Sequence, residues 1–261
     1  MRVTIPALLF VLLLPGPARA GAWTLDAGQA QVISGAVVSR ATREFHSSTS
    51  PEHKVVFDKI FMQNWAEYGL TDAVTLFAAP EMVTATFDMN GTGLERTRAA
   101  SIDAGARILL LSRIGMLSLQ VSAKSAGAFD MSTSAGGQYG RQLELRLLYG
   151  REFKLFRHKV YIDLEVAERW IQRPRPNEMT ADATVALWLT PKNLLMLQSF
   201  NTIAGGGAKP PYGYYRQHKL QFSILRRLSK HWSLQTGLFF SPAGQSIVRE
   251  QGMIAQLWYC Y

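Results

Sequence analysis

Residues 117–124 read Leu117-Ser118-Leu119-Gln120-Val121-Ser122-Ala123-Lys124, with an apolar side chain at every second position and a polar one between. Successive side chains of a β-strand point to opposite faces, so a strand here has one apolar and one polar face. On a helix the same residues would place polar groups on every side. The stretch therefore predicts a β-strand that separates an apolar environment from a polar one.

The same alternation recurs along the chain and predicts an antiparallel all-β barrel of about twelve strands. The expected strands are 29–42, 55–68, 73–87, 100–111, 116–126, 141–149, 159–171, 180–189, 194–203, 215–227, 232–241 and 248–261. Short connections alternate with long ones, as in outer-membrane barrels with tight periplasmic turns and long outer loops. An even strand number places both termini in the periplasm. The segment 150–158 is longer than the short turn expected there.

The first twenty residues have the pattern of a secretory signal peptide. Arg2 precedes an apolar run from Ile5 to Leu14, and Ala18-Arg19-Ala20 fits the small-x-small cleavage pattern. The apolar run is too short for a membrane span, which takes about 20 residues. We expect a signal peptide over 1–20, cleavage after Ala20, and a barrel domain over 21–261 in the outer membrane of a Gram-negative cell.

The composition argues against several other classes of protein. The chain is 48% hydrophobic, yet beyond residue 20 it has no run of 18 apolar residues that would predict a transmembrane helix. The net charge is +9, but the basic residues are scattered, so we expect no nucleic-acid partner. The single cysteine, Cys260, allows no internal disulfide. No motif predicts a metal or a cofactor.

The last strand ends on Tyr261, with apolar or aromatic residues at every second position from 253 onward. Proteins inserted by the outer-membrane assembly machinery have such an ending, so we expect this machinery as a partner. Aromatic side chains near strand ends are expected to form two girdles at the membrane interfaces. The periplasmic girdle would contain Trp65, Tyr68, Tyr149, Trp188, Trp232, Tyr259 and Tyr261. The outer girdle would contain Trp170, Phe200, Tyr214, Tyr215 and Phe240.

Alternation alone does not say which face meets water, because a soluble sandwich would hide its apolar face. The signal segment, the loop lengths and the terminal aromatic favour a barrel whose apolar face contacts outer-membrane lipid. The candidate pore-lining residues are then Asp103, Arg107, Lys124, Glu144, Arg146, Asp163, Glu165, Arg169 and Asp182, with Lys219 on another wall. They form either a paired network that stiffens the wall or a selectivity patch, and Lys219 would bias the pore toward anions.

The lumen of a barrel this size should be narrow. Eight strands leave an interior just filled by side chains, and sixteen to eighteen leave an open channel. About twelve strands would admit small solutes, and loops or the stretch around Trp23 could plug the passage.

Three short phrases carry a resemblance to a known family. They are the segment Glu67–Asp72 followed by Val74-Thr75-Leu76, the segment Asp103–Arg107, and the closing Leu257-Trp258-Tyr259. Together they resemble the phenol-degradation meta-pathway family of outer-membrane proteins, which are porin-like or transporter barrels. The resemblance implies a barrel and the uptake of small molecules. It carries no catalytic residues.

Three functions are compatible with this pattern. The first is a narrow porin or transporter for small solutes. The second is a structural or secretion-accessory barrel, such as part of a surface-polysaccharide system. The third is an outer-membrane lipid acyl hydrolase, for which Ser199, Asn201 and His218 share the apolar, outward parity near the outer rim. No motif surrounds these three residues, so we expect no enzymatic activity.

Overall fold

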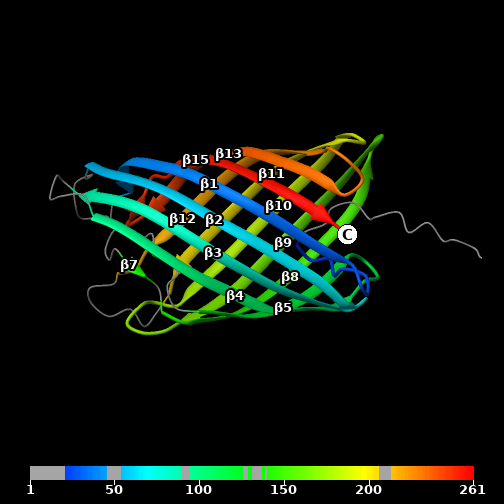
Figure 1. Ribbon diagram of the computed structural model, residues 1–261, viewed down its shortest axis with the longest axis horizontal. Coiled ribbons are helices and arrows are strands. Elements are labelled where there is room, and N and C mark those ends of the chain that lie inside the picture. Colours follow the sequence, from blue (N-terminus) through cyan, green and yellow to red (C-terminus); the bar gives the residue numbers. More distant parts are fainter. Residues whose placement is uncertain are drawn as a thin grey trace, which may run out of the picture.

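The computed structural model describes residues 21–45, 54–89, 95–125, 129–130, 137–138, 140–205 and 213–261. Twelve antiparallel strands form a closed barrel (Figure 1), in which the first strand pairs with both the second and the last. Within this described part, no helix is long and apolar enough to cross a membrane. The twelve-stranded ring confirms the predicted antiparallel all-β barrel.

The barrel strands follow one another around the wall in chain order. They are β1 (Ala30–Phe45), β2 (Lys54–Thr71), β3 (Val74–Met89), β4 (Glu95–Leu111), β5 (Met116–Lys124), β8 (Gln142–Leu155), β9 (His158–Ile171), β10 (Glu178–Thr190), β11 (Asn193–Ala204), β12 (Arg216–Arg227), β13 (Trp232–Gln245) and β15 (Gln251–Cys260). The short strand β14 (Ile247–Val248) pairs with the end of β1, and β6 (Phe129–Asp130) pairs with β7 (Gly137–Gln138) outside the wall. Each predicted strand overlaps one of the twelve.

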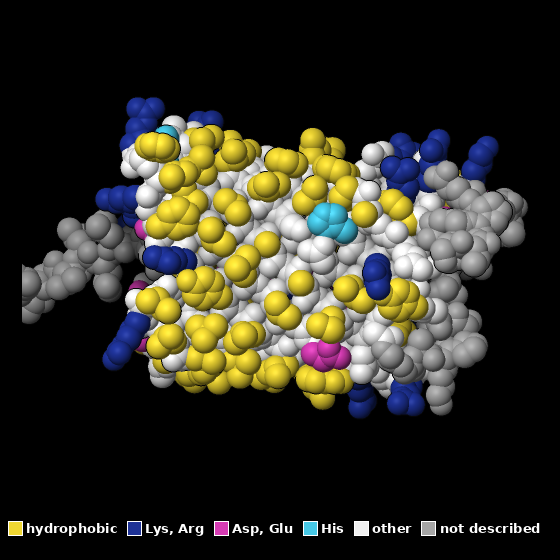
Figure 2. Space-filling model, turned by 180° about the vertical axis from the view of Figure 1, so that it is seen from behind, with side chains coloured by type: hydrophobic (Ala, Val, Ile, Leu, Met, Phe, Trp, Pro, Cys, Tyr) yellow, Lys and Arg dark blue, Asp and Glu magenta, His cyan; other side chains and the backbone are white. Residues whose placement is uncertain are grey.

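The apolar residues point outward, as the membrane interpretation requires. On β5, Val121 is 49% exposed, whereas its neighbours Gln120 and Ser122 are buried inside the barrel. Figure 2 shows hydrophobic side chains over the middle of the outer surface, with Lys and Arg side chains gathered at its two ends. This distribution reverses that of a soluble protein and matches a barrel in contact with lipid.

The connections divide the barrel into two ends. The tight turns, the start of β1 and the chain terminus Tyr261 lie at one end, here called the turn end. The end of β1 and the start of β2 lie at the other, here called the loop end (Figure 1). The predicted long turn at 150–158 is instead a projecting hairpin, because β8 continues to Leu155 and pairs there with His158. Arg151 breaks the alternation at the start of this extension, but it resumes beyond, where Phe153 and Leu155 alternate with Glu152 and Lys154.

The aromatic residues only partly follow the predicted girdles. At the turn end, Tyr68, Tyr149, Trp232, Tyr259 and Tyr261 lie on the outer face, with Trp232 and Tyr259 in ring contact at 4.7 Å. Trp170, Tyr214 and Phe240 are also exposed on the outer face.

Four aromatic assignments to a girdle are wrong, because these rings point inward. Trp65 stacks on Phe77 at 4.6 Å on the inner face, and Trp188 packs against the buried core of the barrel. Phe200 lines the interior cavity and Tyr215 is buried in it. Each of these residues has the inward parity of its strand, and parity decides the face regardless of how near the strand end lies.

Candidate functional site in the barrel interior

Two adjoining cavities occupy the barrel interior. The larger measures about 510 Å³, and the second, toward the loop end, measures about 360 Å³. They share the lining residues Lys124, Arg169, Phe200 and Gln221, so they follow one another along the barrel axis. All ten candidate residues from the sequence line one cavity or the other; Lys219 lines the second. Their inward position follows directly from strand parity.

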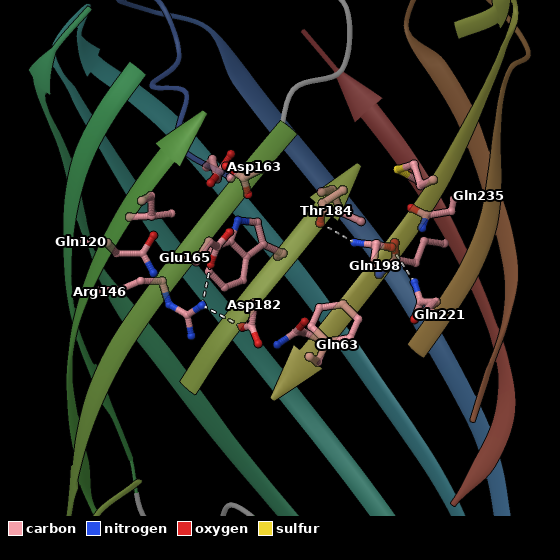
Figure 3. Close-up of a pocket in the computed structure, with 18 of the residues that line it drawn as sticks. Gln63, Gln120, Arg146, Asp163, Glu165, Asp182, Thr184, Gln198, Gln221 and Gln235 are labelled. Atoms are coloured by element: carbon pink, nitrogen blue, oxygen red, sulfur yellow. Dashed lines mark hydrogen bonds and ion pairs between the residues drawn. The ribbon is translucent and has the colours of Figure 1, made fainter. Parts of the chain in front are cut away.

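One wall of the larger cavity carries a ladder of ion pairs. Arg146 on β8 contacts Glu144 at 2.8 Å, Glu165 on β9 at 2.5 Å and Asp182 on β10 at 3.2 Å. Figure 3 shows the last two carboxylates converging on the Arg146 guanidinium. A planar guanidinium presents five N–H donors in a fixed fork, so one arginine can bind carboxylates from three strands.

The ladder continues toward the loop end through Arg169. Its guanidinium contacts Glu144 and Glu178, each at 2.7 Å. Lys124 pairs with Glu81 at 2.8 Å and stands opposite Asp103 in the β4–β5 register. Most of the charged lining residues thus form ion pairs within the wall, whereas Asp103 and Asp163 form none in the described part of the chain.

The adjoining part of the wall, from β10 to β12, carries glutamines in place of ion pairs, a feature that the sequence analysis missed. Gln221 donates to Gln198 at 2.7 Å and Gln198 donates to Thr184 at 3.3 Å, forming a short amide track (Figure 3). Further glutamines line the same cavity, namely Gln31, Gln63, Gln235 and Gln256. Each stands at an inward position of an alternating strand, so parity would have found them had uncharged polar residues been considered.

A second ionic cluster lies toward the loop end. The carboxylate of Glu250 is fully buried and contacts Lys59 and Lys219, each at 2.6 Å, and Ser39 donates a further hydrogen bond to it. Two ammonium groups therefore share one carboxylate, so cations outnumber anions in this cluster. The ring of Phe239 lies 5.3 Å below the Lys219 ammonium, and Phe61 lines the same cavity. Glu250 is not among the candidate residues from the sequence, although it lies in the predicted strand 248–261 at the same inward parity as Gln256.

The segment that precedes β1 folds into the turn end of the barrel. Ala22 and Trp23 are buried there, and the Trp23 ring packs edge-on against Tyr161 at a centroid distance of 5.9 Å. Ser118 donates to the Ala22 carbonyl at 2.5 Å, and Arg107 donates to the Trp23 carbonyl at 2.9 Å. The stretch around Trp23, here called the plugging segment, therefore fills the turn end of the barrel.

The three candidate hydrolase residues meet on the outer face, but in the wrong order. The ring of His218 hydrogen-bonds the Asn201 side chain, and Asn201 donates to Ser199 Oγ at 3.1 Å. The amide thus lies between the histidine and the serine. A serine nucleophile needs the imidazole beside its own hydroxyl to accept the proton, and no Ser199–His218 hydrogen bond exists among the described residues.

The closed wall, apolar outside and polar inside, defines the chain as a β-barrel of the outer-membrane type. The sequence matches no protein-family model and no curated protein. In structure, the chain is similar to the COG4313 outer membrane channel from Pseudomonas putida F1, with a TM-score of 0.70 and 13% identity over 94% of this chain and 100% of that one.

Two autotransporter barrels are also similar. The translocator domain of NalP from Neisseria meningitidis has a TM-score of 0.60 and 13% identity, covering 91% of this chain and 90% of that one. The transport unit of AIDA-I from Escherichia coli has a TM-score of 0.55 and 8% identity, covering 90% of each chain. At sequence identities this low, the structural similarity shows a shared fold alone.

Proposed function

We propose that the protein is a narrow channel of the outer membrane for small solutes. The observation that carries this proposal is the pair of adjoining cavities inside a closed barrel, lined by ion pairs and by amide side chains. Paired charges and amides can exchange hydrogen bonds with a polar solute as it replaces water, at little cost in desolvation. The similarity to a solved outer membrane channel supports the same function.

In this proposal the turn end faces the periplasm and the loop end faces outward. The tight turns and both ends of the mature chain then lie in the periplasm, as is usual for these barrels. Trp232 and Tyr259, on the outer face of the wall, would lie at the periplasmic interface of the membrane. Tyr261 would be available to the assembly machinery. The resemblance to the phenol-degradation meta-pathway family supports uptake of small molecules as the direction of transport.

The alternatives are less well supported. The interior side chains leave spaces of about 510 and 360 Å³, which suit small molecules better than a folded protein or a polymer. This weighs against a secretion passage, although a purely structural barrel would have the same interior. The amide between Ser199 and His218 weighs against a lipid hydrolase.

Conductance across planar bilayers tests the channel. The purified protein should give small, discrete conductance steps and should let small sugars or amino acids swell proteoliposomes. A Trp23→Ala variant, which removes the largest side chain of the plugging segment, should raise both. Matched proteoliposomes with Trp170→Ala, a change on the outer face, should behave as the unmodified protein does. Absence of conductance and of solute flux in both the unmodified protein and Trp23→Ala would show the proposal to be wrong.

A further inference from the structure

The main chain at Gly21 lies against the carboxylate of Asp163 inside the barrel. A Cβ atom on Gly21 would stand 2.1 Å from Asp163 Oδ2, and the next residue, Ala22, donates its N–H to Asp163 Oδ1 at 2.9 Å. Because the nitrogen and Cβ of one residue are only about 2.5 Å apart, the Gly21 nitrogen lies within a few ångströms of this carboxylate. Gly21 also has a φ of 86°, a conformation that glycine adopts without strain.

Asp163 is buried without a cation of its own. It is 7% exposed, and no lysine or arginine in the described part of the chain forms an ion pair with it. Arg107, a nearby base, already binds Glu67 at 2.9 Å. A second carboxylate, Glu165, lies two residues along β9 on the same face and is bound by Arg146. A buried carboxylate beside another one is costly unless a positive group compensates it.

We propose that cleavage after Ala20 supplies this positive group. Hydrolysis adds one water across the Ala20–Gly21 peptide bond, which leaves a carboxylate on Ala20 and an ammonium group on Gly21. The neutral amide of the uncleaved chain offers one donor and no charge, whereas the α-ammonium offers three donors and a full positive charge. Asp163 is therefore the binding site for the mature N-terminus of the same chain, and this inference rests on the predicted cleavage site and not on the channel function.

The site would fasten the plugging segment from its free end. Ala22 and Trp23 are already held through their carbonyls by Ser118 and Arg107. Without an anchor at Gly21 the chain end would be free to leave the cavity, since terminal residues fray unless they are tied down. Signal removal would thus create the last contact that fixes the segment inside the barrel, after the chain has reached the compartment in which it folds.

Reactivity of the α-amine tests the proposal. Mature protein purified from outer membranes is treated near neutral pH with a small amine-acylating ester, and acylation of Gly21 is followed by mass spectrometry of the N-terminal peptide. The folded protein should react at least about tenfold more slowly than the urea-unfolded protein. A tenfold ratio corresponds to about 1.4 kcal/mol of stabilisation of the bound α-ammonium group. A different first residue, or equal rates in the two states, would overturn the proposal.

A matched pair of variants separates the carboxylate from burial alone. Asp163→Asn should return the acylation rate toward the unfolded value. Asp182→Asn removes a carboxylate from the same cavity that is bound to Arg146, and it should leave the rate unchanged. Equal protection of Gly21 in both variants would show that burial, and not Asp163, shields the amine.

A second measurement holds even where Asp163→Asn does not assemble. Unmodified mature protein is unfolded, acetylated at its α-amine and refolded beside an untreated sample. The acetylated sample should lose the N-terminal segment to a nonspecific protease several-fold faster, and equal rates would contradict the site. Neither readout requires conductance, so a barrel that transports nothing would still test the ammonium site.

Discussion

Arg107 and Glu67 form an ion pair of 2.9 Å at the turn end, with only 4% and 3% of their side chains exposed. The two residues lie on β4 and β2, so the pair reaches across the inner face of β3. Arg107 also donates to Gln120 and to the Trp23 carbonyl. One guanidinium therefore joins the barrel wall to the segment that fills its turn end.

Replacing this arginine should weaken the barrel and loosen the plug together. Arg107→Ala leaves the Glu67 carboxylate buried without a partner, which costs roughly 3–5 kcal/mol. Unfolding by urea in lipid vesicles should show the loss, and planar-bilayer conductance should rise. Arg40→Ala is the control, because its contact with Asp58 is 3.9 Å long and exposed, so its cost should be within about 1 kcal/mol. Equal unfolding midpoints for the two variants would contradict the assignment.

The outer face provides a second prediction. Leu238 is 60% exposed in the middle of β13, within the apolar outer face that we expect to contact lipid. Leu238→Arg should cost about 2–4 kcal/mol of folding free energy in lipid vesicles, the penalty for arginine at the midplane of a membrane barrel. Phe156→Arg, on the 94% exposed tip of the β8–β9 hairpin, should have almost no effect. If Leu238→Arg also left folding in vesicles unchanged, the apolar face would not contact lipid.

The sequence predicts the wall of this barrel well because period-two alternation encodes both of its faces at once. A strand with Leu145 outward must turn Glu144 and Arg146 inward, so the charged lumen follows from parity alone. Nearness to a strand end predicts the wrong face for Trp65 and Trp188, because parity decides which way a side chain points. Trp65 has the same parity as the inward Glu67, and that relation was readable in the sequence.

Other parts of the interior could not be read from the sequence. Parity in the predicted strand 248–261 gives Glu250 the inward face, but it does not name the residues that Glu250 contacts. Its two partners, Lys59 and Lys219, belong to strands β2 and β12 that lie far apart in the chain. The contact of Gly21 with Asp163 spans a similar distance in sequence and depends on how a strandless segment folds back. Such contacts follow from the closure of the barrel, which local pattern does not specify.

The loop-end cluster should set the ion preference of the channel. Glu250→Gln removes the carboxylate that Lys59 and Lys219 share. The anion-to-cation permeability ratio, measured from the reversal potential in a salt gradient, should therefore rise several-fold. Lys219→Met removes one of the cations and should shift it the other way. Shifts of the same sign in both variants, or no shift in either, would mean that the permeating ions do not pass this cluster.

Arg146 provides the last prediction, because it contacts three carboxylates from three strands. Arg146→Met leaves Glu165 and Asp182 without an ion-pair partner in the described part of the barrel, whereas Glu144 keeps Arg169. Breaking a buried pair in this way should cost roughly 3–5 kcal/mol in urea unfolding. Adding Glu165→Gln and Asp182→Asn to the same protein should recover most of this loss, because neutral replacement of a whole ionic group is often close to neutral in stability.

The same triple variant distinguishes the two possible roles of the ladder. If the ladder only stiffens the wall, the triple variant should unfold near the midpoint of the unmodified protein and keep its ion selectivity. If the ladder is a selectivity patch, selectivity should change although stability returns, because the carboxylates that solutes pass have become amides. A triple variant as unstable as Arg146→Met alone would show that the lost stability came from packing of the arginine stem and not from the unpaired carboxylates.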